Sequence, residues 1–256
     1  MPLAILVLAA GKGTRMESDL PKVLHQLRGQ PLLAHVLDTA RQLHPDRLIA
    51  IVGHRADLVE AEIAPKYSEV EFVNQGEMLG TGHAVTKAHS ALQDFEGDIL
   101  VTCGDAPLLT SATLDDLRKK RAQFDAGAAM LVGRLDEPGS YGRVVMDESG
   151  QVEAIVEAKD ATPEILALQT VNAGTYCFRA RDLWEQLARV GNDNKSGEYY
   201  LTDVIGLLRG AGQSVVGELV AAREMTGINT KSELAALEAQ LESAEMGMAQ
   251  SEAQPS

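Results

Sequence analysis

Basic side chains surround a glycine-containing loop near the start of the sequence. The loop, Gly11-Lys12-Gly13-Thr14-Arg15-Met16, follows an apolar run, and Lys22 comes shortly after it. Because glycine has no side chain to hold a ligand away, backbone N–H groups in such a loop can approach a phosphate closely. The loop matches neither the dinucleotide fingerprint nor the Walker loop, and many glycine loops after strands are only turns. A phosphate site flanked by three cations is the functional hypothesis.

Four later residues could complete such a site, and each also has an ordinary structural interpretation. Asp105 follows an apolar segment and could cap a helix or bind Mg²⁺, which prefers carboxylate oxygen. Asn229 could offer a neutral oxygen to the same ion or belong to a turn. We favour a hydrogen-bonded structural role over acid–base catalysis for His83. Glu157 stands in a stretch typical of a solvated turn. No serine or cysteine has a nucleophile motif, and the six histidines show no metal spacing.

The charge and cysteine content narrow the class of protein. A formal charge of -14 argues against nucleic-acid and membrane partners, which need a broad basic surface. Residues 1–30 nevertheless carry +2, which fits a local anion site. Cys103 and Cys177 are too few for a disulfide framework, so we expect reduced thiols. The apolar run at the start is too short and lacks the flanking charge of a signal peptide or membrane span. We expect a cytoplasmic protein.

Apolar runs alternate with helical patterns through the first half of the sequence. Residues 3–8, 48–52 and 98–102 are predicted to be buried strands, residues 32–43 and 58–63 helices, and residues 80–92 a loop that opens a third helix. This alternation predicts an α/β fold with a Rossmann-like, mostly parallel sheet and helices on both faces. Ligands of such sheets bind beyond the carboxyl ends of the strands, where Gly11, Gln75 and Asp105 fall.

The pattern changes after residue 126. Residues 128–132, 142–146, 152–156 and 171–178 read as strands with few helices between them, which predicts a smaller, more antiparallel subregion closing over the sheet. Helical spacing returns around residue 184 and over 199–208. Thr230 and Glu233 form a capping box that opens a final helix. We therefore divide the chain into a domain of residues 1–229, a helix of residues 230–248 and a flexible tail of residues 249–256.

Nine motifs, taken together and in this order, resemble those of a known family. They are Leu8-Ala-Ala-Gly-Lys-Gly-Thr-Arg-Met16, Pro21-Lys-Val-Leu-His25, Leu79-Gly-Thr-Gly-His-Ala84, Gly104-Asp105, Tyr141-Gly-Arg143, Ile155-Val-Glu-Ala-Lys-Asp160, Asn172-Ala-Gly174, Gly197-Glu-Tyr-Tyr-Leu-Thr-Asp203 and Gly227-Ile-Asn229. The chain is similar, from residue 3 to about 230, to the uridylyltransferase domain of bacterial bifunctional N-acetylglucosamine-1-phosphate uridyltransferase/glucosamine-1-phosphate acetyltransferases. The first motif is shared by sugar-nucleotide pyrophosphorylases generally.

The resemblance implies a nucleotide-diphospho-sugar transferase fold and a reaction of UTP with N-acetylglucosamine 1-phosphate. The products would be UDP-N-acetylglucosamine and pyrophosphate. The nucleotide-binding residues it implies are Leu8, Ala9, Ala10, Gly11, Gly13, Gln75, Gly80, Thr81 and Gly104. Arg15, Lys22 and Asp105 would be catalytic, with Asp105 and Asn229 binding Mg²⁺. The antiparallel subregion would contact the sugar or its phosphate through Gly142, Glu157, Asn172, Tyr200 and Thr202.

The sequence departs from the family pattern in two places. Cys103 stands where the resemblance leads us to expect tyrosine. Family members also continue beyond the final helix into a β-helix of hexapeptide repeats that carries the acetyltransferase site, whereas only Met246–Ser256 follows here. We expect a shortened form or a naturally single-domain enzyme, without acetyltransferase activity, and the sequence indicates no oligomeric state. Two alternatives stay open: a pyrophosphorylase for another sugar 1-phosphate or nucleotide, and a sugar-nucleotide-binding regulator without catalysis.

Overall fold

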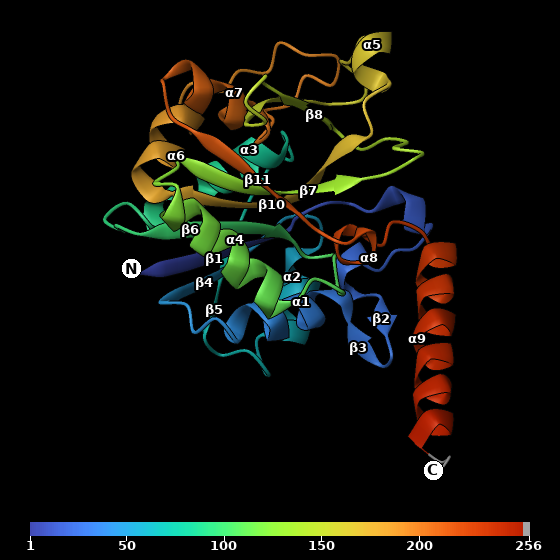
Figure 1. Cartoon of the computed structure of the whole chain (residues 1–256). Coiled ribbons are helices and arrows are strands. Elements are labelled where there is room, and N and C mark those ends of the chain that lie inside the picture. Colours follow the sequence, from blue (N-terminus) through green and yellow to red (C-terminus); the bar gives the residue numbers. More distant parts are fainter. Residues whose placement is uncertain (253–256) are drawn as a thin grey trace.

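A nine-stranded sheet organises the molecule (Figure 1). The computed structural model describes the backbone of residues 1–252 and the side chains of residues 1–243. The principal strand order is β11-β7-β10-β6-β1-β4-β5, and β8 and β9 extend the sheet from β10. Its strands are β1 (Leu3–Ala9), β4 (Arg47–Val52), β5 (Val70–Asn74), β6 (Asp98–Cys103), β7 (Ala128–Arg134), β8 (Arg143–Met146), β9 (Val152–Val156), β10 (Thr170–Arg179) and β11 (Val215–Leu219).

The half of the sheet formed by β6, β1, β4 and β5 is parallel throughout. Within β1, Leu3, Ile5 and Val7 pack on one face, while Ala4 and Leu6 pack on the other. Both faces are covered by helices, so every position of the strand is apolar rather than every second one. The predicted α/β sheet is confirmed.

Helices form a layer on each side of this sheet. One face is covered by α1 (Leu32–Arg41), α2 (Ala56–Ile63) and α4 (Ser111–Gln123). The other is covered by α3 (Thr81–Lys87), α6 (Ala180–Leu187) and α7 (Asp203–Gly210). Shorter elements lie in the connections: η1 (Thr14–Met16), η2 (Lys22–Leu24), η3 (His89–Ala91), α5 (Pro163–Leu166), α8 (Ala222–Met225) and a separate two-stranded sheet of β2 (Gln26–Leu27) and β3 (Gln30–Pro31).

The antiparallel strands continue the main sheet. Strand β10 runs antiparallel to β6 and β7, and β8 pairs antiparallel with both β9 and β10. The register of β10 against β7 shifts between Asn172 and Tyr176. Such a bulge bends a strand and re-aims its side chains. The bulge falls at a predicted sugar-binding residue, Asn172.

The start of α7 differs from the sequence prediction. Helix α7 begins at Asp203, so residues 199–202 are not helical as the spacing suggested. Their backbone instead pairs with the start of α3 and the residues just before it: Tyr199 N–H donates to Leu79 O at 2.8 Å and Gly82 N–H to Tyr199 O at 2.8 Å. These contacts with a distant segment outweigh the local helical preference.

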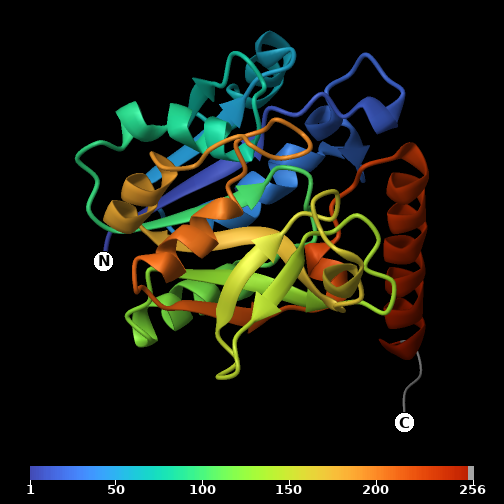
Figure 2. The ribbon, with the colours of Figure 1, turned by 90° about the horizontal axis from the view of Figure 1, so that it is seen from above.

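The final helix, α9, spans Lys231–Glu252, four residues beyond the predicted end at 248. The residues after Gly247 include alanine, glutamine and glutamate, all good helix formers, and one glycine costs a helix only about 1 kcal/mol relative to alanine. Residues 253–256 of the predicted tail lie outside the described part of the chain. Figures 1 and 2 show α9 at one side of the molecule, far from the N-terminus. Its first turns pack through Leu237 on Leu27, Leu32 and Ile228.

Among the residues that the structure describes, no helix is both long and apolar enough to cross a membrane.

Candidate functional site

The loop after β1 positions Lys22 through a close approach of two backbone segments. Gly13 has φ of +60°, and a Cβ on it would lie 2.5 Å from the Cβ of Lys22, so only glycine fits there. Pro21 precedes Lys22, and Val23 and Leu24 after it are buried in the core. The backbone of Lys22 is therefore anchored on both sides, while its long side chain points back across the loop.

Arg15, Lys22, Asp105 and Asn229 meet in one cluster. The Lys22 ammonium donates to Asp105 Oδ2 and lies 3.1 Å from Asn229 Oδ1. The Arg15 guanidinium donates to the same Asn229 oxygen at 2.9 Å. The side chains of Lys22 and Asp105 are 16% and 15% exposed, so water screens their ion pair only partly. The residues predicted to be catalytic or metal-binding thus come together from three distant parts of the chain.

A backbone hydrogen bond holds Asp105 beside the segment that carries Asn229. Ile228 N–H donates to the backbone oxygen of Asp105 at 2.9 Å, and the Asn229 side-chain amide donates to Gly227 O at 3.0 Å. The predicted capping box is present: Glu233 Oε2 accepts from Thr230 N–H at 3.1 Å and from Asn229 N–H at 2.6 Å. Helix α9 therefore begins at the point where it can fix the backbone of Asn229.

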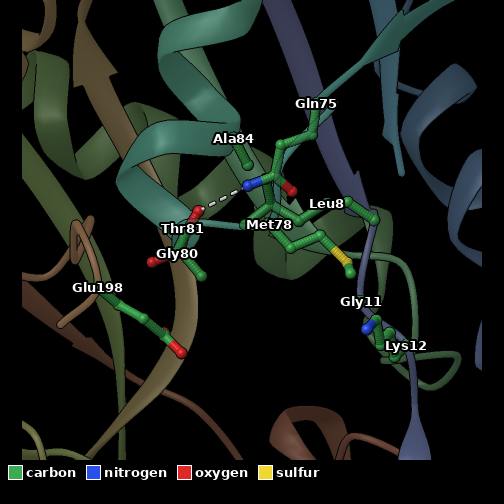
Figure 3. A pocket seen from close by; sticks show the side chains of 10 residues that line it. Leu8, Gly11, Lys12, Gln75, Met78, Gly80, Thr81, Ala84 and Glu198 are labelled. Atoms are coloured by element: carbon green, nitrogen blue, oxygen red, sulfur yellow. Dashed lines mark hydrogen bonds between the residues drawn. The ribbon is translucent and has the colours of Figure 1, made fainter. Parts of the chain in front are cut away.

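A cavity of about 420 Å³ opens beside the glycine loop (Figure 3). Six of the nine residues predicted to bind a nucleotide line it: Leu8, Ala10, Gly11, Gln75, Gly80 and Thr81. The other three lie close by without lining it. Ala9 is in the core, Gly13 packs on Lys22, and Gly104 N–H donates to Leu8 O at 2.9 Å.

Gln75 and Gly80 shape the wall of this cavity. The Gln75 side chain is buried, and its Nε2 donates to Gly80 O at 3.0 Å, as Figure 3 shows. Gly80 has φ of +111°, and a Cβ there would lie 2.5 Å from Tyr199 O. Leu201 N–H also donates to Thr81 Oγ1 at 3.0 Å. These hydrogen bonds join the start of α3 to the segment before α7. Only a glycine at position 80 allows the two segments to approach so closely.

His83 supports this wall and does not line the cavity. Its Nδ1 lies 3.3 Å from Gln75 Nε2. Burial lowers the pKa of His83, and the nearby Lys87 lowers it further. Its hydrogen bond agrees with the structural role favoured by the sequence.

The predicted sugar-binding residues gather around Glu157. Thr202 Oγ1 donates to Glu157 Oε1 at 3.0 Å, and a Cβ on Gly142 would lie 3.5 Å from Glu157 Oε2. Asn172 N–H donates to Gly142 O at 2.9 Å. Glu157 and Tyr200 also line a second cavity of about 310 Å³. The structure therefore links all five residues, although only two of them line that cavity.

Negative charges and burial shape the electrostatics around Glu157. Burial raises the pKa of Glu157, the hydrogen bond from Thr202 opposes that rise, and the neighbouring carboxylates Asp203 and Asp160 add to it. Burial and then Asp160 also raise the pKa of Asp203. A ligand that donates hydrogen bonds, such as a molecule with several hydroxyl groups, suits such surroundings.

The structure brings further residues to the first cavity and to the Asp105 cluster. Met78, Lys12 and Glu198 line the first cavity, with Glu198 facing the glycine loop from across it (Figure 3). Burial raises the pKa of Tyr141, and the charges of Asp105 and Glu233 raise it further, so its hydroxyl lies in the field of the Asp105 cluster. Tyr141 and Glu198 belong to motifs quoted above, but their side chains carry no local signal of a role.

Both cysteines are free. Cys103 Sγ lies 3.7 Å from Gly174 O, next to the Asp105 cluster. Burial raises the pKa of Cys103 to about 12, so its thiol is protonated at neutral pH. This agrees with the expectation of reduced thiols.

The oxygens of Asp105 and Asn229 suit a divalent cation. No three histidine, cysteine, aspartate or glutamate side chains among the described residues are grouped to hold a metal ion. Mg²⁺ at a nucleotide site needs only one or two protein ligands, because water and phosphate supply the rest. The Lys22 ammonium already touches both oxygens, which indicates that this pair attracts positive charge.

Residues 5–203 match the family model described as MobA-like NTP transferase domain. The chain is also similar to curated proteins named "Bifunctional protein GlmU". It is 48% identical to that of Jannaschia sp. over 242 residues, 94% of this chain and 53% of the relative. It is 46% identical to that of Lactobacillus delbrueckii subsp. bulgaricus over 232 residues, 90% of this chain and 50% of the relative. The chain therefore spans about half the length of these relatives.

Solved structures share the fold. Apo UDP-glucose pyrophosphorylase superposes with a TM-score of 0.78 at 15% identity, covering 96% of this chain and 100% of that one. UDP-glucose pyrophosphorylase complexed with UDP-glucose gives a TM-score of 0.72 at 16% identity, covering 86% and 90%. At such low identity the likeness establishes the nucleotide-diphospho-sugar transferase fold alone.

Proposed function

This chain belongs to the family of MobA-like NTP transferase domains, and we propose that it transfers the uridylyl group of UTP to N-acetylglucosamine 1-phosphate. The products are UDP-N-acetylglucosamine and pyrophosphate. Two findings support this reaction together: the ordered motifs and the 44% to 48% identity to the GlmU proteins. The observation that carries it is the meeting of Lys22, Asp105 and Asn229 beside the nucleotide-sized cavity.

The proposed reaction needs no general base. The attacking group, the phosphate of the sugar 1-phosphate, is already an anion, so catalysis rests on in-line positioning and on neutralising charge at the α-phosphate of UTP. Arg15 and Lys22 supply that positive charge in this proposal. Neither requires a proton transfer, which agrees with His83 being engaged by Gln75 away from the cavity.

The first cavity holds the uridine in our proposal. Leu8, Ala10 and Gly11 and the wall made by Gln75, Gly80 and Thr81 surround the base and ribose, and Ala9, whose side chain is in the core, joins Leu8 to Ala10. The glycine loop leads from there to Lys22. Gly13 and Gly104 take part through the backbone, since neither has a side chain to offer.

The residues around Glu157 hold the sugar phosphate. Glu157 accepts hydrogen bonds from hydroxyl groups of the sugar, and the Tyr200 hydroxyl donates to them or accepts from them. Thr202 orients the Glu157 carboxylate. Gly142 leaves room beside that carboxylate, while Asn172 reaches the same region from the bulge of β10.

Membership of a nucleotidyltransferase family suggests a divalent metal, and we assign Mg²⁺ to the oxygens of Asp105 and Asn229. When bound, the ion would neutralise negative charge on the phosphates of UTP. The Asp105 carboxylate would bind the cation, and its backbone is fixed by the hydrogen bond from Ile228 N–H. We further propose that the protein works in the cytoplasm.

Pyrophosphate release tests the proposal. UTP with N-acetylglucosamine 1-phosphate and Mg²⁺ should be turned over faster than any other pairing in a panel of four nucleoside triphosphates and several sugar 1-phosphates. Faster turnover of a different pair would make the chain a pyrophosphorylase of another specificity. Binding of UDP-N-acetylglucosamine without release of pyrophosphate from any pair would make it a non-catalytic regulator.

A further inference from the structure

Two protein cations contact the oxygen atoms that we assign to the metal. Lys22 contacts both Asp105 Oδ2 and Asn229 Oδ1, and Arg15 contacts the Asn229 oxygen as well. We propose that the Lys22 ammonium occupies the place of the divalent cation until a nucleoside triphosphate draws it away, so that metal and nucleotide bind cooperatively. This inference rests on the proposed function, because it takes the metal and the triphosphate from it.

The net charge of the cluster supports the proposal that Lys22 must leave before the metal binds. Arg15, Lys22 and Asp105 together carry one net positive charge, and Asp105 is the single carboxylate among them. A divalent cation entering such a site is repelled by the Lys22 ammonium, whose side chain is only 16% exposed, and less strongly by Arg15, which is exposed and therefore more screened by water. The described part of the chain offers no group of three metal-ligating side chains here to offset that repulsion.

The backbones that carry the two donor oxygens are fixed, whereas the ammonium can move. Asp105 is held through its backbone oxygen, and Asn229 through the Glu233 carboxylate and its own bond to Gly227. Apart from its contacts with these two oxygens, Lys22 is held at its backbone, by the packing of Gly13 and the burial of its neighbours. Its four-carbon stem lets the ammonium swing without any backbone change.

A triphosphate supplies the alternative partner. Lys12 and Gly11 line the nucleotide cavity, and Lys22 packs on the same loop through Gly13, so phosphates bound at the loop come within reach of Lys22. Once Lys22 and Arg15 pair with phosphate, Asp105 and Asn229 are free, and the phosphates add negative charge for the metal. Each ligand therefore raises the affinity of the other by the same factor.

Binding of Mn²⁺ measured by its EPR signal tests this without turnover. We compare the wild type with Lys22→Met, which keeps the stem but removes the charge, first with Mn²⁺ alone and then with α,β-methylene-UTP. Lys22→Met should bind Mn²⁺ alone about tenfold more tightly than the wild type, a factor typical of coupled sites. The nucleotide analogue should tighten Mn²⁺ binding about tenfold or more in the wild type and much less in Lys22→Met.

Two further variants give the controls. Lys12→Met removes a charge from the same loop, but no contact joins Lys12 to Asp105 or Asn229 among the described hydrogen bonds and ion pairs, so its binding of Mn²⁺ alone should stay within about twofold of the wild type. Asp105→Asn should weaken Mn²⁺ binding both in the wild type and in Lys22→Met, which shows that the measured Mn²⁺ binds at Asp105. Circular dichroism checks that each variant is folded.

Equal or weaker binding of Mn²⁺ alone by Lys22→Met would overturn the inference, as would an equal gain in Lys12→Met. That result can occur while uridylyl transfer by the wild type is intact, in which case the proposed function stands. Conversely, cooperative Mn²⁺ and nucleotide binding without pyrophosphate release from any substrate pair would support the inference and overturn the proposed reaction.

Discussion

The ammonium of Lys22 lies 3.1 Å from Asn229 Oδ1, although 207 positions separate the two residues in the chain. Lys22 begins η2, shortly after the first loop, and Asn229 lies just before α9. The cluster therefore forms only after both ends of the folded domain have met on the carboxyl edge of the sheet. This relationship makes the start of α9 part of the site and leads to predictions at both ends of the chain.

Replacing Lys22 by alanine should lower the turnover of UTP and N-acetylglucosamine 1-phosphate by about 10²- to 10³-fold, since one charged donor at a reacting phosphate is worth about 3–4 kcal/mol. The fold should stay intact, because the buried neighbours Val23 and Leu24 are unchanged. Steady-state pyrophosphate release measures the effect. Lys119→Ala, which removes an exposed lysine from α4, is the control. A loss of only a few-fold for Lys22→Ala would contradict its catalytic role.

Replacing Asp105 by alanine should remove the Mg²⁺-dependent part of the activity. The variant loses the one carboxylate of the cluster, and turnover should fall about 10²-fold or more at saturating Mg²⁺. A titration of Mg²⁺ against pyrophosphate release, with a chelator as the zero point, gives the result. Asp116→Ala, on the exposed side of α4, should behave as the wild type. Unchanged turnover of Asp105→Ala would show that our metal assignment is wrong.

Replacing Glu233 by alanine tests the link between α9 and the site. The N–H groups of Asn229 and Thr230 lose their shared acceptor, and loss of a capping interaction costs about 1 kcal/mol of stability. We expect a lower melting temperature together with a higher Mg²⁺ requirement, because Asn229 is no longer held in place. Glu242→Ala, an exposed glutamate of the same helix, should change neither. A melting temperature that falls while the Mg²⁺ requirement stays constant would restrict Glu233 to a capping role.

Replacing Gly80 by alanine should weaken the binding of both substrates. The added Cβ would lie 2.5 Å from Tyr199 O and must push away the segment that carries Glu198 and Tyr200. Gly76→Ala is a matched control, because Gly76 also has positive φ but open space around it. That control should lose about 1 kcal/mol of stability from backbone strain. Gly80→Ala should lose more and also raise KM for both substrates; equal losses in the two variants would contradict the role of the close approach.

Replacing Glu157 by glutamine should stabilise the fold and weaken sugar-phosphate binding. Burial raises the pKa of Glu157 above its ordinary value of 4.5, so the wild type is most favoured below that pH and loses stability as the pH rises through the folded-state pKa. The melting temperature of Glu157→Gln should therefore exceed that of the wild type at pH 7.5, and the difference should shrink towards pH 4. KM for the sugar phosphate should rise. Glu153→Gln, exposed on β9, should show neither effect; a variant less stable than the wild type at pH 7.5 would contradict the prediction.

Much of the fold follows from local pattern. The apolar runs of β1, β4 and β6 and the helical spacing between them predict parallel strands covered on both faces, because a strand buried on both sides has no polar position. The glycines of the first loop and the Thr230–Glu233 capping box are equally local signals. Here a short stretch of chain contains all the physical information that its own conformation needs.

Other features depend on contacts between distant segments. Residues 199–202 have helical spacing, yet the backbone of Leu79 and Gly82 holds them out of the helix. The end of α9 is a different case: the predicted end at residue 248 is wrong for a local reason, because a glycine in a run of good helix formers does not stop a helix.

The sequence by itself determined which side chains could bind phosphate, metal and sugar, since charge and oxygen donors belong to residue types. Only the tertiary structure decided that the Lys22 ammonium lies on the oxygens of Asp105 and Asn229, and that Glu198 faces the glycine loop across the cavity. The physical reason is that a distance between atoms far apart in the chain depends on how the whole sheet and its loops pack, and no local stretch of sequence contains that information.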